Sequence, residues 1–107
     1  MTDSTTTGTS ETLAENSSRS LTIEGRPLIL ARHAGEQFLY ANLCPHAAET
    51  LDPLGGNLSN ESGDLLRCQR HGAEFLTRTG ECVAGPCLGE RLEAVPFTAV
   101  GGDIYLD

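Results

Sequence analysis

Short apolar runs separated by turn residues follow one another along this chain from Leu21 onward. Leu21 and Ile23 alternate with polar residues, and a second apolar run at 28–32 follows the turn sequence Glu24-Gly25-Arg26-Pro27, which predicts a β-hairpin. No window of about a dozen residues shows sustained helical periodicity. The pattern therefore predicts an all-β, antiparallel sandwich or small barrel. Further strands are expected at residues 37–41, 65–68, 73–76, 92–97 and 103–106.

The first 20 residues differ in amino-acid composition from the rest of the chain. They are rich in Ser and Thr, which predicts either a polar tail or an edge strand near 5–7 with a turn at 10–16. Residues 21–107 are expected to form one domain. Two long connections, at 43–64 and 81–91, interrupt the regular spacing of strands, and both contain cysteine. Long connections in a compact domain are commonly functional.

Composition and charge exclude several classes of function. The 107 residues carry a formal net charge of −8, which repels phosphate backbones and argues against nucleic-acid binding. No apolar run is long enough to cross a membrane. The N-terminus has no basic region followed by an apolar one, so a cytoplasmic location is expected. Four cysteines in such a chain indicate metal or redox chemistry before disulfides.

Two Cys/His pairs supply a complete set of metal ligands. Cys44 and His46 form the first pair, and Cys68 and His71 form the second. Zinc could use the same atoms, but zinc fingers usually pair Cys with Cys and His with His. One Cys and one His from each of two loops suit a two-iron cluster, in which one iron takes both thiolates and the other both imidazoles.

This pattern resembles the Rieske [2Fe–2S] family, whose signature is C-x-H, a spacer, and C-x-x-H. The likeness covers roughly residues 21–107 and includes Thr79-Gly80-Glu81 and Gly85-Pro86. It implies a Rieske-type antiparallel β-sandwich or barrel with a cluster-binding subdomain of two loops, at about 43–91. The implied site is one [2Fe–2S] cluster, with the inner iron held by the two thiolates and the outer iron by the two imidazoles, the ligands being Cys44, Cys68, His46 and His71.

This chain differs from respiratory members of the family at positions near the implied cluster, and these differences predict its redox potential. Those members join the two cluster loops by a disulfide, whereas this chain has Glu49 and Arg70 at the matching positions. They also donate hydroxyl hydrogen bonds to the cluster sulfurs from positions that hold Ala73 and Phe75 here. Fewer donors lower the potential, so we expect a midpoint near the low end of the Rieske range, roughly −150 mV.

Other candidate residues have less specific interpretations. Gly85-Pro86 resembles the family's proline loop, which covers the cluster. Cys82 and Cys87 could form a disulfide or act as spare ligands, but packing as two small apolar side chains is favoured because four ligands are already present. His33 is expected to be a turn residue. Acidic residues in the spacer are expected to form a solvated face, since their spacing matches no calcium loop.

The resemblance implies a soluble one-electron carrier and not an enzyme by itself. It is similar to ferredoxin components that pass electrons from a flavoprotein reductase to a terminal ring-hydroxylating oxygenase, and a monomer is expected. The alternatives are a small Rieske subunit or regulatory module of a larger enzyme, such as nitrite reductase, and a zinc-stabilised binding module. The expected contact patch with a redox partner comprises Pro45, His46, Gln69, Arg70 and His71.

Overall fold

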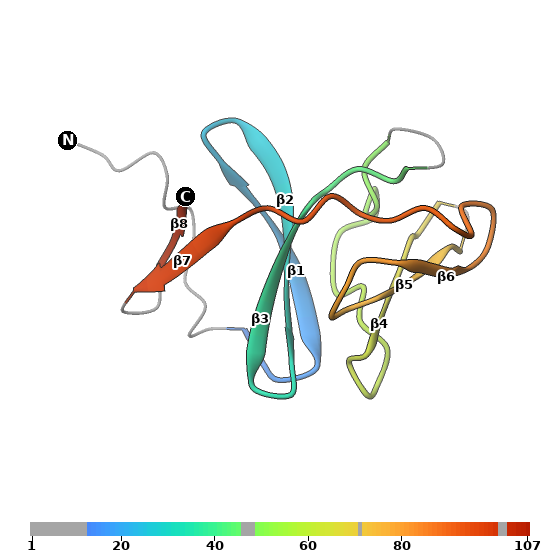
Figure 1. Cartoon of the computed structure of the whole chain (residues 1–107), viewed down its shortest axis with the longest axis horizontal. Coiled ribbons are helices and arrows are strands. Elements are labelled where there is room, and N and C mark those ends of the chain that lie inside the picture. The colour runs from blue at the N-terminus through green and yellow to red at the C-terminus, as the bar shows by residue number, and fades with distance from the viewer. Residues whose placement is uncertain (1–12, 46–48, 71, 101–102) are drawn as a thin grey trace.

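The computed structural model describes residues 13–45, 49–70, 72–100 and 103–107, and within these ranges it is all-β (Figure 1). No helix in the described part of the chain is long and apolar enough to cross a membrane. The eight strands form three antiparallel sheets. They are β1 (Ser17–Ile23), β2 (Arg26–His33), β3 (Glu36–Ala41), β4 (Leu65–Arg67), β5 (Glu74–Leu76), β6 (Cys82–Ala84), β7 (Phe97–Val100) and β8 (Asp103–Leu106).

The first sheet, β1-β2-β3, is a meander with two tight turns. Glu24 and Gly25 have positive φ values, of 53° and 80°, and Ala34 and Gly35 have φ values of 53° and 76°. Two consecutive positive φ values define the turn that best matches the twist of an antiparallel pair. The predicted hairpin is therefore present, with only Glu24 and Gly25 outside the strands.

Strand β2 is buried on both faces, and this explains its unbroken apolar run. Ile29 and Ala31 belong to one core cluster, which reaches towards β4, β5 and β6. Leu28 and Leu30 belong to the other cluster, which includes Ile104 of β8. Because neighbouring side chains of a strand point to opposite faces, the central sheet is packed on both sides. In Figure 1 it stands between the β4-β5-β6 sheet and the β7-β8 hairpin.

The segment 92–97 corrects one prediction. It was expected to be a strand, but it follows β3 only through an isolated bridge between Tyr40 and Ala94 and flanking backbone bonds. Pro96 has no N–H to donate, so regular pairing cannot continue along this stretch. The regular strand, β7, begins only at Phe97.

Two further boundaries differ from the predictions. Strand β1 begins at Ser17 and not at Leu21, because Ser18 is buried and both its N–H and its hydroxyl donate to Asn57 Oδ1, at 2.9 and 3.2 Å. Leu13 is also buried in the core. The edge strand considered at 5–7 lies outside the described residues. The connection 81–91, expected to be irregular, contains the short strand β6.

Tyr40 ties the central sheet to the β4-β5-β6 subdomain. Its side chain is 2% exposed, and its hydroxyl donates to the carbonyl of Thr77 at 2.7 Å. Thr77 in turn donates from its N–H to Asp64 O and from its hydroxyl to Gly63 O. Burial raises the pKa of Tyr40 to about 12, since the phenolate would lose its hydration.

This raised pKa predicts an alkaline loss of stability. Tyr40 is neutral in both states below pH 10, and above it the unfolded chain ionises first, so the free energy of unfolding falls between about pH 10 and pH 12. The expected slope is up to about 1.4 kcal/mol per pH unit. Denaturant titrations at several pH values measure it. Tyr40→Phe should remove this contribution to the slope and cost about 1 kcal/mol at pH 7; an unchanged slope in the variant would contradict the assignment.

Candidate metal centre

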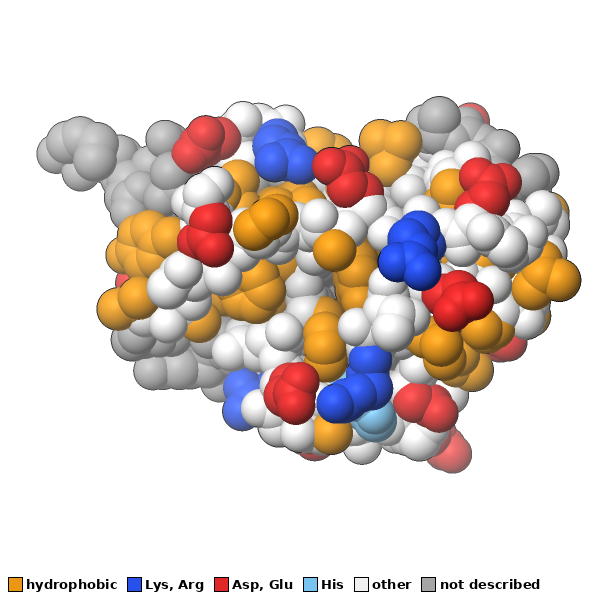
Figure 2. Space-filling model, in the orientation of Figure 1, with side chains coloured by type: hydrophobic (Ala, Val, Ile, Leu, Met, Phe, Trp, Pro, Cys, Tyr) orange, Lys and Arg blue, Asp and Glu red, His pale blue; other side chains and the backbone are white. Residues whose placement is uncertain are grey.

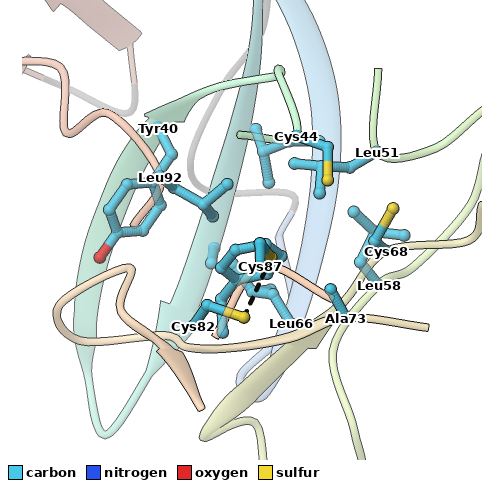
Figure 3. Packing of buried hydrophobic residues seen from close by; sticks show 13 residues of the cluster. Tyr40, Cys44, Leu51, Leu58, Leu66, Cys68, Ala73, Cys82, Cys87 and Leu92 are labelled. Carbon is cyan, nitrogen blue, oxygen red and sulfur yellow. Dashed lines mark hydrogen bonds between the residues drawn. The ribbon is translucent and has the colours of Figure 1, made fainter. Parts of the chain in front are cut away.

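The two candidate thiol ligands are buried at the ends of different loops. Cys44 follows β3, and Cys68 follows β4. Their side chains are 0% and 1% exposed and belong to the same core cluster. In Figure 3 both sulfur atoms lie at the same edge of the packed residues. The fold therefore brings together two soft sulfur donors that are far apart in sequence.

Asn42 shapes the first loop. It is a buried polar residue, 3% exposed, and its Oδ1 accepts a hydrogen bond from the N–H of Leu51 at 2.8 Å. Its Nδ2 donates to Asp52 Oδ1 at 2.8 Å. A further hydrogen bond within this loop runs from the N–H of Cys44 to Glu49 O, at 2.7 Å. Sequence reasoning missed this role of Asn42, because no local pattern shows which backbone group a buried amide will meet.

The second loop is bound to the first mainly by Gln69. Its N–H donates to Leu51 O at 2.8 Å, and its side chain accepts from Leu54 N and donates to Gly55 O, both at 2.8 Å. These three bonds use the backbone and both ends of the amide. They fix the position of the neighbouring Cys68 relative to the first loop.

An ion pair joins Glu49 and Arg70, the two positions at which the family resemblance expects no disulfide. Arg70 Nε lies 3.4 Å from Glu49 Oε1 and donates to Thr50 O at 2.9 Å. The side chains of Arg70 and Glu49 are 32% and 52% exposed, so solvent weakens this ion pair. The two loops are thus connected at the same two positions by polar contacts.

Gly85 allows the third loop, residues 81–91, to lie against the second loop, which begins at Cys68. Cys68 donates its N–H to Ala73 O at 2.8 Å, so the backbone of these two residues lies close together. Gly85 packs on Ala73, and a Cβ at Gly85 would lie only 2.7 Å from Ala73 Cα. Gly85 also has a φ of +99°, which favours glycine. The covering role expected of Gly85-Pro86 stays a prediction.

Cys82 and Cys87 lie under this third loop as buried thiols. They are 1% and 0% exposed, and their sulfur atoms are 3.0 Å apart. Burial, followed by the neighbouring thiols of Cys82 and Cys44, raises the pKa of Cys87 to about 12. While both cysteines are reduced, Cys87 is therefore a neutral thiol at pH 7.

His46 and His71, the two candidate imidazole ligands, lie outside the described residues. Within the described ranges, no three His, Cys, Asp or Glu side chains converge as a metal site. The two described candidate ligands, Cys44 and Cys68, fit an iron–sulfur cluster. Both thiols are buried in the same core cluster, where two hydrogen-bonded loops meet. The assignment of all four ligands stays a prediction.

Residues outside this set have structural roles. His33 is half-buried, and its Nδ1 lies 3.3 Å from Asn16 Oδ1. Asp64 accepts hydrogen bonds from Ser62 and Asn60, and the first of these contributes most to lowering its pKa. Glu61 and Asp64 are exposed, as expected of a solvated face.

The family model for the Rieske [2Fe-2S] domain matches residues 4–98 of this chain. The chain therefore belongs to the Rieske [2Fe-2S] domain family, the class that its fold and paired loops define. The family implies one [2Fe–2S] cluster as cofactor. The match begins within the segment 1–20 that was expected to precede the domain.

Solved structures share this fold. The chain is similar to the ferredoxin of carbazole 1,9a-dioxygenase from Nocardioides aromaticivorans IC177, with 22% identity, 94% and 93% of the two chains covered and a TM-score of 0.74. It is similar to the Sphingomonas yanoikuyae B1 ferredoxin at 24% identity, 95% of each chain and a TM-score of 0.75. A terminal oxygenase of carbazole 1,9a-dioxygenase from Novosphingobium sp. KA1 matches at 23% identity and a TM-score of 0.76, over 94% of this chain but 28% of the oxygenase. No curated protein matches.

Proposed function

We propose that this chain is a one-electron carrier of the ferredoxin type, which accepts an electron from a flavoprotein reductase and passes it to a terminal oxygenase. The observation that carries the proposal is a pair of buried thiols in a chain of the Rieske [2Fe-2S] family. The two loops that hold these thiols are joined by hydrogen bonds and an ion pair. The cluster supplies reversible one-electron chemistry when bound. The proposed ligands are Cys44, His46, Cys68 and His71.

The described residues of the chain supply binding and shielding for this role. Cys44 and Cys68 would hold the cluster by their sulfur atoms from the interior, where both side chains are shielded from water. Gln69 and Arg70 hold the two loops at a fixed separation through the bonds described above. Gly85 allows the third loop to approach Ala73 and to close one side of the centre.

A docking surface is available beside the centre. A cavity of about 660 Å³ is lined by Cys68, Gln69 and Arg70, together with Leu54 of the first loop. Leu54 is 85% exposed, and its N–H is bound to the Gln69 side chain. Apolar side chains at the centre of a small contact suit brief complexes between redox partners. Figure 2 shows acidic side chains spread over the visible face and interleaved with arginines, so charge on this face is mixed.

Two solved structures of similar fold support the choice of partner. The ferredoxin of carbazole 1,9a-dioxygenase matches this chain over nearly the whole length of both. Another similar structure is a complex of reduced oxygenase and oxidised ferredoxin in carbazole 1,9a-dioxygenase. We extend the role of electron donor to an oxygenase from these proteins to this chain. The monomeric state and the cytoplasmic location expected from the sequence stay predictions.

A coupled assay tests the proposal. NADH, a flavoprotein ferredoxin reductase and cytochrome c as acceptor are mixed with catalytic amounts of the iron-loaded chain. Cytochrome c reduction should rise in proportion to the added chain over many turnovers, and a redox titration should place the midpoint near roughly −150 mV. A rate independent of the chain, or a strongly positive midpoint, would refute a low-potential carrier.

A pair of matched variants tests the docking surface. Leu54→Glu should lower the reductase-dependent rate about tenfold and leave the visible spectrum unchanged, because it places a charge at the centre of the contact. Val100→Glu makes the same kind of change at another exposed apolar residue, on β7, and should leave the rate unchanged. Equal effects of the two variants would mean that docking uses a different surface.

A second function is favoured by one observation. The terminal oxygenase from Novosphingobium sp. KA1 carries this fold over 28% of its length, so the fold also occurs within larger redox enzymes. A small subunit or module of such an enzyme should copurify with a large partner in a fixed ratio. A carrier should purify alone and remain redox-active.

A further inference from the structure

The segment 81–90 places two buried side chains in the interior of the protein. All ten of its residues are described, and among them only Cys82 and Cys87 are buried. The residues between and after them are exposed or half-buried: Val83, Ala84, Gly85, Pro86, Leu88, Gly89 and Glu90. We call this segment the covering loop, after the role expected of it. Its backbone is held by the pairing of β6 with β5 and by the packing of Gly85 on Ala73, and its two buried side chains are those of the cysteines.

The two thiols are arranged for bond formation with each other. Their sulfur atoms are 3.0 Å apart, about 1 Å longer than a disulfide bond (Figure 3). In the reduced form Cys87 donates its S–H to Cys82 Sγ, and Cys82 donates its S–H to Ala84 O at 3.3 Å. Oxidation removes both hydrogens together, so no buried donor is left without an acceptor.

A bond at this position would connect two parts of the subdomain. Cys82 lies on β6 and pairs with Phe75 of β5. Cys87 follows the turn at Gly85, where the chain packs on Ala73 beside Cys68. The cross-link would therefore close the covering loop onto the strand from which it departs, next to the candidate centre.

We propose that Cys82 and Cys87 form an oxidisable thiol pair, in which an intrachain disulfide locks the covering loop over the candidate centre. With a peroxide as oxidant, one thiol is converted to a sulfenic acid with release of one water. The second thiol then attacks the sulfenic sulfur, the S–S bond forms, and a second water leaves. Two thiols and one hydrogen peroxide thus give one disulfide and two waters. The pair supplies none of the four proposed cluster ligands, so this inference does not depend on the proposed electron transfer.

Peptide mapping tests the proposal on the iron-loaded full chain. Trypsin cleaves after Arg78 and Arg91 and so releases residues 79–91 as one peptide with both cysteines, while Cys44 and Cys68 fall in other peptides. The protein is treated with hydrogen peroxide, denatured, alkylated and digested. The expected product is a 79–91 peptide that carries no alkyl group and is lighter than the reduced peptide by two hydrogens. Full alkylation of both cysteines after this treatment, or a cross-link from residue 87 to the peptide containing Cys44, would overturn the pairing.

Thermal unfolding tests the locking function. The oxidised chain should unfold about 5–10 °C above the reduced chain, because the cross-link constrains a short loop of the unfolded state. A phosphine reductant should reverse the shift. Cys82→Ser is the control: it cannot form the bond, and peroxide should leave its unfolding temperature unchanged. A disulfide that forms without any shift in the wild-type chain would overturn the locking function.

Discussion

Cys68→Ser is expected to yield a protein without bound iron or acid-labile sulfide. In the proposed site the Cys68 thiolate is a ligand of the cluster, and a serine hydroxyl does not ionise near neutral pH to replace it. Cys68 is 1% exposed and cannot be substituted by a solvent ligand without opening the loop. Iron and sulfide analysis, together with the visible and EPR spectra of the reduced protein, measure the loss.

Cys82→Ser is a matched control for this experiment. Cys82 is also 1% exposed, so the variant places a hydroxyl at an equally buried position of the same subdomain. It should retain the full iron content, because Cys82 is not one of the four proposed ligands. Full iron content in Cys68→Ser would remove the basis of the ligand assignment, and loss of iron in Cys82→Ser would restore the spare-ligand interpretation.

Gly85→Ala is expected to lower the free energy of unfolding by about 4 kcal/mol, which is a large share of the stability of a small domain. Two effects add. The φ of +99° is strained for a residue with a side chain, and the new methyl group would lie 2.7 Å from Ala73 Cα. Ala73 is 0% exposed and cannot move outward. Denaturant unfolding of the wild-type and variant chains gives the difference.

Gly89→Ala separates the two effects. Gly89 has a similar φ of +94°, but a Cβ there has no atom within 4 Å. This variant should lose only the backbone contribution, about 1–2 kcal/mol. Equal losses in both variants would show that the contact between the new methyl group and Ala73 does not change the free energy of unfolding.

The central sheet could be predicted because its information is local. Glu24-Gly25 lies between two apolar segments, and the structure places these two residues alone in the turn. The strand β6 could not be predicted in the same way. It has three residues, and its register with β5 shifts between Glu74 and Phe75, which no alternation in the sequence records. The expected strand at 92–97 was wrong because Pro96 cannot donate to a neighbouring strand and the buried residues, Leu92 and Val95, are three positions apart instead of two.

In the candidate site, too, some features could be predicted from the sequence and others could not. The spacing of Cys44 and Cys68 relative to histidine predicts a shared centre, and the structure buries both cysteines in one cluster, while the two histidines lie outside the described residues. The bonds that hold them there could not be predicted. Asn42 and Gln69 contact backbone groups of residues nine or more positions away, so their partners depend on the folded path of both loops.

The connection between the two loops that carry Cys44 and Cys68 has a consequence for its response to reductants. The described contacts between these loops are hydrogen bonds, an ion pair and apolar packing, and all four cysteines are free thiols. None of these contacts is a covalent bond that a reductant can break. The strength of this junction is therefore expected to be the same with and without a thiol reductant.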